Sequence, residues 1–128
     1  MEIILDKQSN FPLLDKYKDK FPVTKNTIFA HKNTIYTNYN LPAHLIIHEA
    51  THLKQQNKIE VDQWHEWYLN DDRFRLEVEI EAYQEQINSV KDRNDRAKLR
   101  LECVNNLSSP LYGSIISKEE ALKKLTLK

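Results

Sequence analysis

Two histidines and a glutamate stand close together in residues 41–57, LPAHLIIHEATHLKQQN, in the order HExxH. On an α-helix, residues four positions apart lie on one face about one turn from each other, so His48 and His52 could both reach a single zinc ion. Glu49 would lie beside that ion. Zinc lowers the pKa of a bound water to about 7, and a neighbouring carboxylate can take its proton and later return it to a leaving amine. The motif therefore predicts the chemistry of a zinc peptidase, if the rest of the chain completes the site.

The residues before the motif favour a β-hairpin that leads into this helix. Two runs rich in β-branched and aromatic residues, 27–30 and 34–37, flank a polar triplet that suits a tight turn, so we expect a hairpin over about residues 23–37. Asn40 could cap the helix, and Pro42 would lie in its first turn, where a missing N–H costs nothing. On the predicted helix, the two histidines share one face and apolar residues occupy the opposite face.

A third zinc ligand has to come from another element, because a catalytic zinc site uses three protein groups and leaves one position for water. Residues of about 73–90 offer Glu77, Glu79 and Glu81. As a strand, this segment would place all three acids on one face. As a helix, it carries an apolar stripe over its whole length, made by Leu76, Ile80, Tyr83, Ile87 and Val90.

The helix is preferred, because the strand pattern covers only the first half of the segment. On a helix, Glu79 lies about 60° from the centre of the stripe, Glu77 about 100° and Glu81 about 140°. A glutamate at the border of a buried face needs a partner, and a zinc ion is one that would justify its desolvation. Glu79 is the predicted third ligand, with Glu77 and Glu81 as solvated neighbours.

Residues 58–72, which join these two helices, are expected to form a polar connection with one helical turn, and Asp71 or Asp72 could cap the next helix. Trp64 and Trp67 in this connection are expected to serve as core packing or as a lid.

Two further helices are predicted after the glutamate helix. The first covers about residues 92–107, and the second covers about 118–125, with Ser117 and Glu120 as a capping box. The basic residues of the first helix alternate with acids and have no aromatic neighbours for base stacking. They therefore indicate a solvated face and no nucleic-acid partner.

Composition and charge are those of a single globular domain. A chain of 128 residues can bury one core, and its 19 basic and 19 acidic residues cancel, so no overall charge would attract nucleic acid or an anionic membrane. No stretch approaches the roughly 18 apolar residues of a membrane span, and the N-terminus lacks a basic start followed by an apolar run. With the lone Cys103, these features predict a cytoplasmic protein without membrane partners. The oligomeric state is not indicated.

The motif and its spacing resemble the gluzincins, in which HExxH lies on one helix and a glutamate ligand on the next. The similarity is greatest to small, minimal gluzincin-like proteins of bacteria and their phages, and it covers roughly residues 27–90. The matching residues are Asn33 to Tyr36, His48 to His52, Gln55, and Glu79 to Tyr83.

This resemblance implies an α+β, mostly helical, zincin-like single domain, with a small N-terminal hairpin packed on the HExxH helix and a following helix that bears the glutamate ligand. It implies that His48, His52 and Glu79 bind one zinc ion and that Glu49 is the general base. It also implies that residues 28–36 include the edge strand along which an extended peptide substrate pairs. Related peptidases carry an aspartate where Tyr83 stands, so the outer partner of a zinc histidine is not predicted here.

Several other side chains are candidates for secondary roles. A group that stabilises the oxyanion could be His65, Tyr68 or Tyr83, and none of the three is favoured. For His65 and for His31, an ordinary surface imidazole is the preferred interpretation. His44 lies four residues before His48, but one helix cannot easily deliver three histidines to one tetrahedral ion, so His44 is expected outside the ligand set.

Three hypotheses follow. The chain is a zinc peptidase with a peptide or protein substrate, and its activity should be lost in Glu49→Gln. Alternatively, it is a catalytically silent zinc-binding protein of the same fold, such as a phage assembly or structural component. As a third possibility, the motif is coincidental on a helical interaction domain, and then a chelator should not change the melting temperature.

Overall fold

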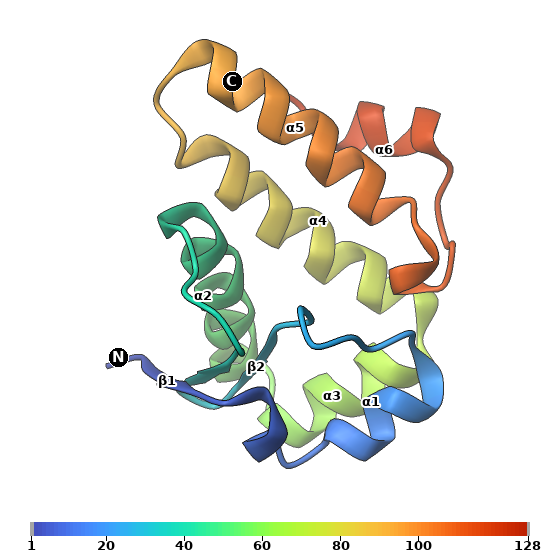
Figure 1. Cartoon of the computed structure of the whole chain (residues 1–128). Coiled ribbons are helices and arrows are strands. Elements are labelled where there is room, and N and C mark those ends of the chain that lie inside the picture. Colours follow the sequence, from blue (N-terminus) through green and yellow to red (C-terminus); the bar gives the residue numbers. More distant parts are fainter. Residues whose placement is uncertain (1, 128) are drawn as a thin grey trace.

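The computed structural model describes residues 2–127 and is mostly helical, with a small three-stranded sheet near the N-terminus (Figure 1). This confirms the predicted mostly helical α+β class. The helices are α1 (Leu14–Lys20), α2 (Ala43–Lys58), α3 (Val61–Asn70), α4 (Asp72–Asn88), α5 (Arg93–Leu107) and α6 (Lys118–Lys124), with short 3-10 helices η1 (Gln8–Asn10) and η2 (Pro110–Tyr112). The strands are β1 (Ile4–Asp6), β2 (Phe29–His31) and β3 (Thr34–Tyr36).

The sheet has the strand order β1-β3-β2, with β1 parallel and β2 antiparallel to β3. The predicted hairpin is present, and it is shorter than expected. Its turn is held by Lys32, which adopts a positive φ of 60°. Because β3 is the central strand, β2 is an edge strand of the sheet.

Helix α2 carries the HExxH motif and packs on this sheet. Leu53 forms a buried apolar cluster with Ala30 and Ile35 from the two hairpin strands. The predicted cap is wrong: the helix begins directly after Pro42, which occupies the N-cap position, and no side chain caps it. Pro42 has φ −64° and ψ 157°, an extended conformation that is usual for an N-cap residue.

Helix α3 is longer than the single turn expected within a polar connection. Glu60 caps it by accepting hydrogen bonds from the backbone N–H groups of Asp62 and Gln63. Trp64 and Tyr68, one turn apart, are both buried in an aromatic cluster with the N-terminal segment. Burial of these two rings outweighs the polar composition of the segment. Asp71 then caps α4, as predicted, through its bond to the N–H of Phe74.

Helix α4 lies between α2 and α5, as Figure 1 shows, and contacts both. A helix with neighbours on two sides buries a broader face than a single stripe. Glu79 is therefore only 3 % exposed. It lies within the buried face of α4, whereas the sequence predicted it at the border of that face. Glu77 and Glu81 are exposed, as expected.

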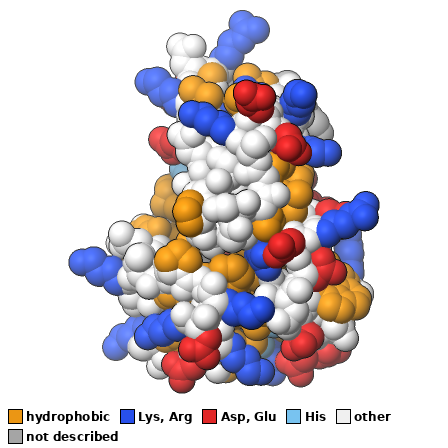
Figure 2. All heavy atoms as spheres, turned by 90° about the vertical axis from the view of Figure 1, so that its right-hand side faces the viewer, with side chains coloured by type: hydrophobic (Ala, Val, Ile, Leu, Met, Phe, Trp, Pro, Cys, Tyr) orange, Lys and Arg blue, Asp and Glu red, His pale blue; other side chains and the backbone are white. Residues whose placement is uncertain are grey.

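The C-terminal helices complete a second core against α4. Its buried members are Tyr83, Ile87, Leu99, Cys103, Val104, Leu107, Ile116, Ala121 and Leu125. Ser117 caps α6 as predicted, by accepting a bond from the N–H of Glu120. Basic and acidic side chains are interspersed over the face in Figure 2. Among residues 2–127, no helix combines the length and apolar character needed to cross a membrane.

Candidate metal centre

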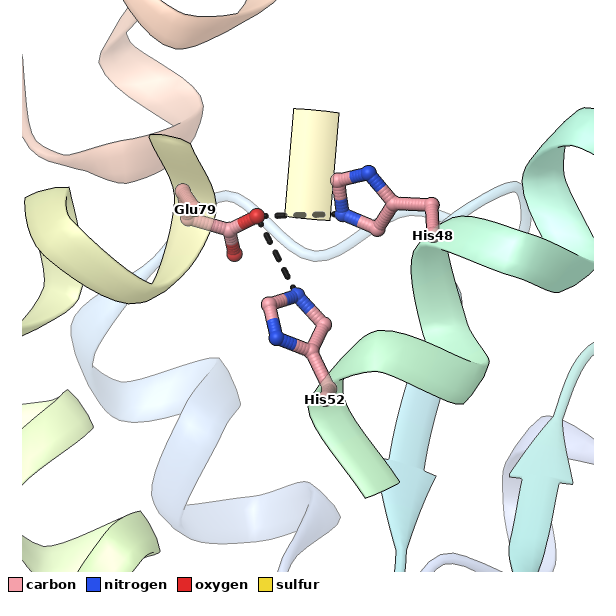
Figure 3. A group of neighbouring side chains, drawn as sticks. All are labelled: His48, His52 and Glu79. Carbon is pink, nitrogen blue, oxygen red and sulfur yellow. Dashed lines mark hydrogen bonds and ion pairs between the residues drawn. The ribbon is translucent and has the colours of Figure 1, made fainter. Parts of the chain in front are cut away.

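The side chains of His48, His52 and Glu79 converge at the contact between α2 and α4 (Figure 3). The Nε2 atom of His48 lies 3.0 Å from Oε1 of Glu79, and the Nε2 atom of His52 lies 3.2 Å from the same oxygen. All three side chains are buried. Two nitrogens and one carboxylate oxygen thus point at one small volume.

This convergence follows from helix geometry. The four-residue spacing places both imidazole rings on the face of α2 that meets α4, with ring centroids 4.9 Å apart. Glu79 projects from the buried face of α4 toward them. The contact between two regular helices therefore brings together groups that are 27 and 31 positions apart in the chain.

Two glutamines hold the imidazole rings from behind. The Nδ1 atom of His48 lies 2.9 Å from Oε1 of Gln86, and the Nδ1 atom of His52 lies 2.9 Å from Oε1 of Gln55. An amide oxygen only accepts hydrogen bonds, so each Nδ1 must carry the proton. With a metal bound in place of the Nε2 protons, that tautomer would direct the lone pair of each Nε2 at the ion, as in metal sites whose histidines donate to an outer acceptor.

The orientation of the Gln55 amide is fixed by its other contacts, which are both to oxygen acceptors. The Nε2 group of Gln55 donates to the carbonyl of Val78 at 3.1 Å and to Oε1 of Glu81 at 2.8 Å. The Nε2 group of Gln86 is 2.8 Å from Nδ1 of His44. His44 thus acts on the site only through Gln86.

Both glutamines could be found in part from their spacing in the sequence. Gln55 belongs to the resembling motif and lies three residues after His52, within reach of its ring. Gln86 lies seven residues after Glu79, two helical turns along the same face of α4. The sequence did not predict an outer partner for His48, and in the structure Gln86 takes this position. Tyr83 packs its ring against His48, with centroids 4.4 Å apart.

Charge pairing within the cluster is strong. Burial alone would raise the pKa of Glu79, but the charge of His52 and hydrogen bonds from both histidines hold it well below its usual value. Burial alone would lower the pKa of His52, but the Glu79 carboxylate raises it to about 9. Without a cation, the proton on His52 therefore balances the buried carboxylate. Tyr68 donates a hydrogen bond to the second oxygen, Oε2, of Glu79.

Glu49 lies next to this cluster without being one of its three converging groups. Its Oε2 atom is 3.8 Å from Nε2 of His48, and the residue is 6 % exposed. Burial raises the pKa of this carboxyl group. A carboxylate made more basic in this way is better suited to accept a proton.

The donor set fits a zinc ion. Ligand atoms about 2.0–2.1 Å from a tetrahedral zinc are roughly 3.3 Å apart. The spacings of 3.0 and 3.2 Å between Glu79 and the imidazoles are close to that value. Two neutral imidazoles and a carboxylate also suit other divalent transition metals. The cluster could hold a metal ion, and its chemistry does not by itself identify which one.

The cluster forms part of the wall of a cleft of about 370 Å³. Glu49 and Trp64 also line it, as do residues 21–24 and 26–30 from the N-terminal part of the chain, and Tyr112 from η2. The cleft gives a ligand access to a site whose own side chains are largely buried.

No family model, curated protein or solved structure matches the chain.

His65 and His31 are not surface imidazoles, contrary to the sequence-based interpretation. His65 is 3 % exposed, with Nδ1 2.7 Å from the hydroxyl of Tyr17 and Nε2 3.0 Å from Nδ1 of His31. Desolvation, followed by the charges of His31 and His52, lowers the pKa of His65 to about 3. Both of its ring nitrogens are therefore engaged within the fold. Trp64 packs against His52, whereas Trp67 is 42 % exposed.

Proposed function

We propose that the protein is a zinc-dependent peptidase with a zincin-like fold of the gluzincin type. In this proposal His48, His52 and Glu79 hold the ion and Glu49 is the general base. The observation that carries the proposal is the approach of both Nε2 atoms to one oxygen of Glu79, at 3.0 and 3.2 Å, on the wall of a cleft.

The protein's own residues then have distinct tasks. Glu49 takes the proton of the attacking water and passes it to the leaving amine, a transfer for which its raised pKa is suited. Gln55 and Gln86 fix the orientation and the tautomer of the two histidines. A bound zinc ion would supply Lewis acidity, which polarises a carbonyl group and acidifies water.

The edge strand β2 supports a peptide as the substrate. The backbone groups of Asn33 and Thr37 bond to β1, so the alternate residues of β3, Thr34 and Tyr36, bond to β2. Ala30 lies opposite Ile35, and its backbone N–H and C=O therefore point away from β3. Its carbonyl accepts a bond from Gln56, which leaves its N–H for an extended peptide. Ile28 and Ala30 both line the cleft, so a substrate strand paired here would pass the metal cluster.

A catalytically silent zinc-binding protein of the same fold, such as a phage assembly component, is the second candidate. It is favoured by the burial of all three ligand residues, each at most 4 % exposed. In structural zinc sites, however, four protein groups close the coordination sphere. The three converging groups among residues 2–127 leave one position open, which favours the peptidase.

The two candidates are distinguished by separating metal binding from turnover. Wild-type protein should contain one zinc per chain and hydrolyse members of a mixed peptide library, with cleavage followed by mass spectrometry. Glu49→Gln should keep the zinc and lose hydrolysis by at least about a hundredfold. Glu79→Ala should lose the zinc, whereas the matched change Glu77→Ala, on the exposed side of α4, should keep it.

Hydrolysis that survives in Glu49→Gln would refute the role of this residue. A wild-type protein that binds zinc and cleaves no peptide would support the silent candidate. Absence of zinc in the wild type would remove both.

A further inference from the structure

Two tyrosine hydroxyls meet beside the metal cluster. The hydroxyl of Tyr83, on α4, lies 2.5 Å from the hydroxyl of Tyr112, on η2. Tyr83 packs against the ring of His48, and both tyrosines line the cleft together with the cluster. The pair is thus built from two distant parts of the chain at the site.

One of the two hydroxyl protons of this pair is not used in the bond between them. Two hydroxyls carry two protons, and the bond between them uses one. No other group among residues 2–127 accepts the second. Tyr83 is 4 % exposed, whereas Tyr112 is half-buried. In the arrangement in which Tyr83 donates to Tyr112, the spare proton is on Tyr112, which lines the cleft. A hydroxyl that accepts a bond also becomes a stronger donor.

The backbone of Tyr112 is held by a buried arginine. The Nε group of Arg75 donates to the carbonyl of Tyr112 at 3.0 Å, and its Nη1 group donates to the carbonyl of Tyr68 at 2.6 Å. Its Nη2 group binds Asp72, and the guanidinium lies 5.0 Å from the ring centre of Phe21. One rigid fork thus fixes two tyrosines that reach the site from different elements.

The three side chains that the sequence suggested as oxyanion stabilisers already have partners, while the indole N–H of Trp64, which also lines the cleft, has none among residues 2–127. The hydroxyl of Tyr68 donates to Glu79, and both nitrogens of His65 are engaged by Tyr17 and His31. This leaves the sequence-based candidates for oxyanion stabilisation without a free donor. Tyr112 was not among those candidates, because its approach to the site depends on packing far from the motif.

We propose that Tyr112 is a catalytic residue that donates a hydrogen bond to the oxygen of a ligand held in the cleft at the cluster, and that Tyr83 and Arg75 are its positioning residues. The assignment rests on the proposed function, in which that oxygen is the peptide carbonyl on which negative charge develops.

The test combines a binding measurement with kinetics. The protein is loaded with cobalt, and acetohydroxamic acid, a metal-directed ligand with an anionic oxygen, is titrated while the visible spectrum is recorded. Tyr112→Phe should raise the dissociation constant of this probe about tenfold, since it removes one hydrogen bond to a charged oxygen. On a peptide that the wild type cleaves, kcat should fall about a hundredfold while KM changes less than about threefold.

Matched variants separate this role from a structural one. Tyr36→Phe removes a tyrosine hydroxyl in the aromatic core outside the cleft lining and should leave probe binding and kcat unchanged. Tyr83→Phe should have a smaller effect than Tyr112→Phe, and the double variant should equal Tyr112→Phe, because Tyr83 acts through its partner. Metal content and melting temperature are measured for every variant.

The outcomes distinguish this assignment from the proposed function. If the wild type cleaves peptides and Tyr112→Phe matches it in probe binding and kcat, the role of Tyr112 is overturned and the peptidase stands. If no peptide is cleaved but Tyr112→Phe still weakens the probe, the donor is supported and the peptidase fails. A wild type that binds neither zinc nor cobalt overturns both.

Discussion

Replacing Gln86 with leucine should weaken zinc binding although all three proposed ligand residues remain. Leucine has nearly the size of glutamine but cannot accept the proton on Nδ1 of His48, which now lies 2.9 Å from the amide oxygen. Gln86 is 2 % exposed, so water cannot easily replace the lost partner. His48 would then be free to rotate or to adopt the other tautomer, with a proton on Nε2.

The expected loss is 10- to 100-fold in zinc affinity, the usual effect of removing an outer partner of a metal histidine, or about 1.4–2.7 kcal/mol. The dissociation constant is measured at fixed neutral pH by competition with a chromophoric chelator. Gln86→Glu should retain or strengthen binding, because a carboxylate accepts the Nδ1 proton more strongly than an amide.

Gln84→Leu is the matched control, on the same helix. Gln84 exchanges two hydrogen bonds with the backbone of Thr126, at 2.7 and 3.2 Å, remote from the cluster. Its replacement removes these two bonds and a longer one to Oδ1 of Asn88, at 3.4 Å, but should change zinc affinity less than about twofold. If Gln86→Leu binds zinc as tightly as Gln84→Leu, the proposed control of the His48 tautomer is refuted.

Four further outcomes are expected. Burial lowers the pKa of His65 from its ordinary 6.5 to about 3 in the folded protein, so the unfolded chain binds one more proton between these pH values. The free energy of unfolding from urea titrations should therefore fall by up to about 1.4 kcal/mol per pH unit as the pH drops below 6.5, with a shallower slope in His65→Gln. Leu53→Ala, at a fully buried position, should cost about 2–5 kcal/mol in the same assay, and a cost below 1 would contradict the described packing. Asp71→Ala removes the α4 cap and should cost about 1 kcal/mol in the same assay. Chelation of a bound metal with EDTA should lower the melting temperature measured by calorimetry, and an unchanged value would argue against metal bound to the folded state.

Local sequence patterns were sufficient for much of the fold. The positions of α2, α4, α5 and α6 follow from apolar periodicity and from capping residues such as Asp71 and Ser117, whose effects act within one helical turn. The pair His48 and His52 follows from the same periodicity. These features depend on residues that are near neighbours in the chain, which is why they can be inferred before any packing is known.

Tertiary contacts account for what the sequence did not reveal. Helix α3 forms because Trp64 and Tyr68 are buried by the N-terminal segment, a contact with no local signal. The same holds for the bond between His31 and His65, which are 34 positions apart. The buried place of Glu79 depends on α4 having a helix on each side. The burial and the role of these residues are decided by side chains that are distant in the sequence, and not by their neighbours along the chain.

The cleft is assembled from segments distant in the chain, and this affects when the site exists during folding. The turn of α2 that carries both histidines is local and can form early, whereas Glu79, the segment around Ile28 and Tyr112 come together only through long-range packing. A partly folded copy therefore has at most two of the three converging groups and no cleft. If the molecule is a peptidase, incompletely folded copies are inert toward surrounding proteins, and the appearance of activity marks the end of folding.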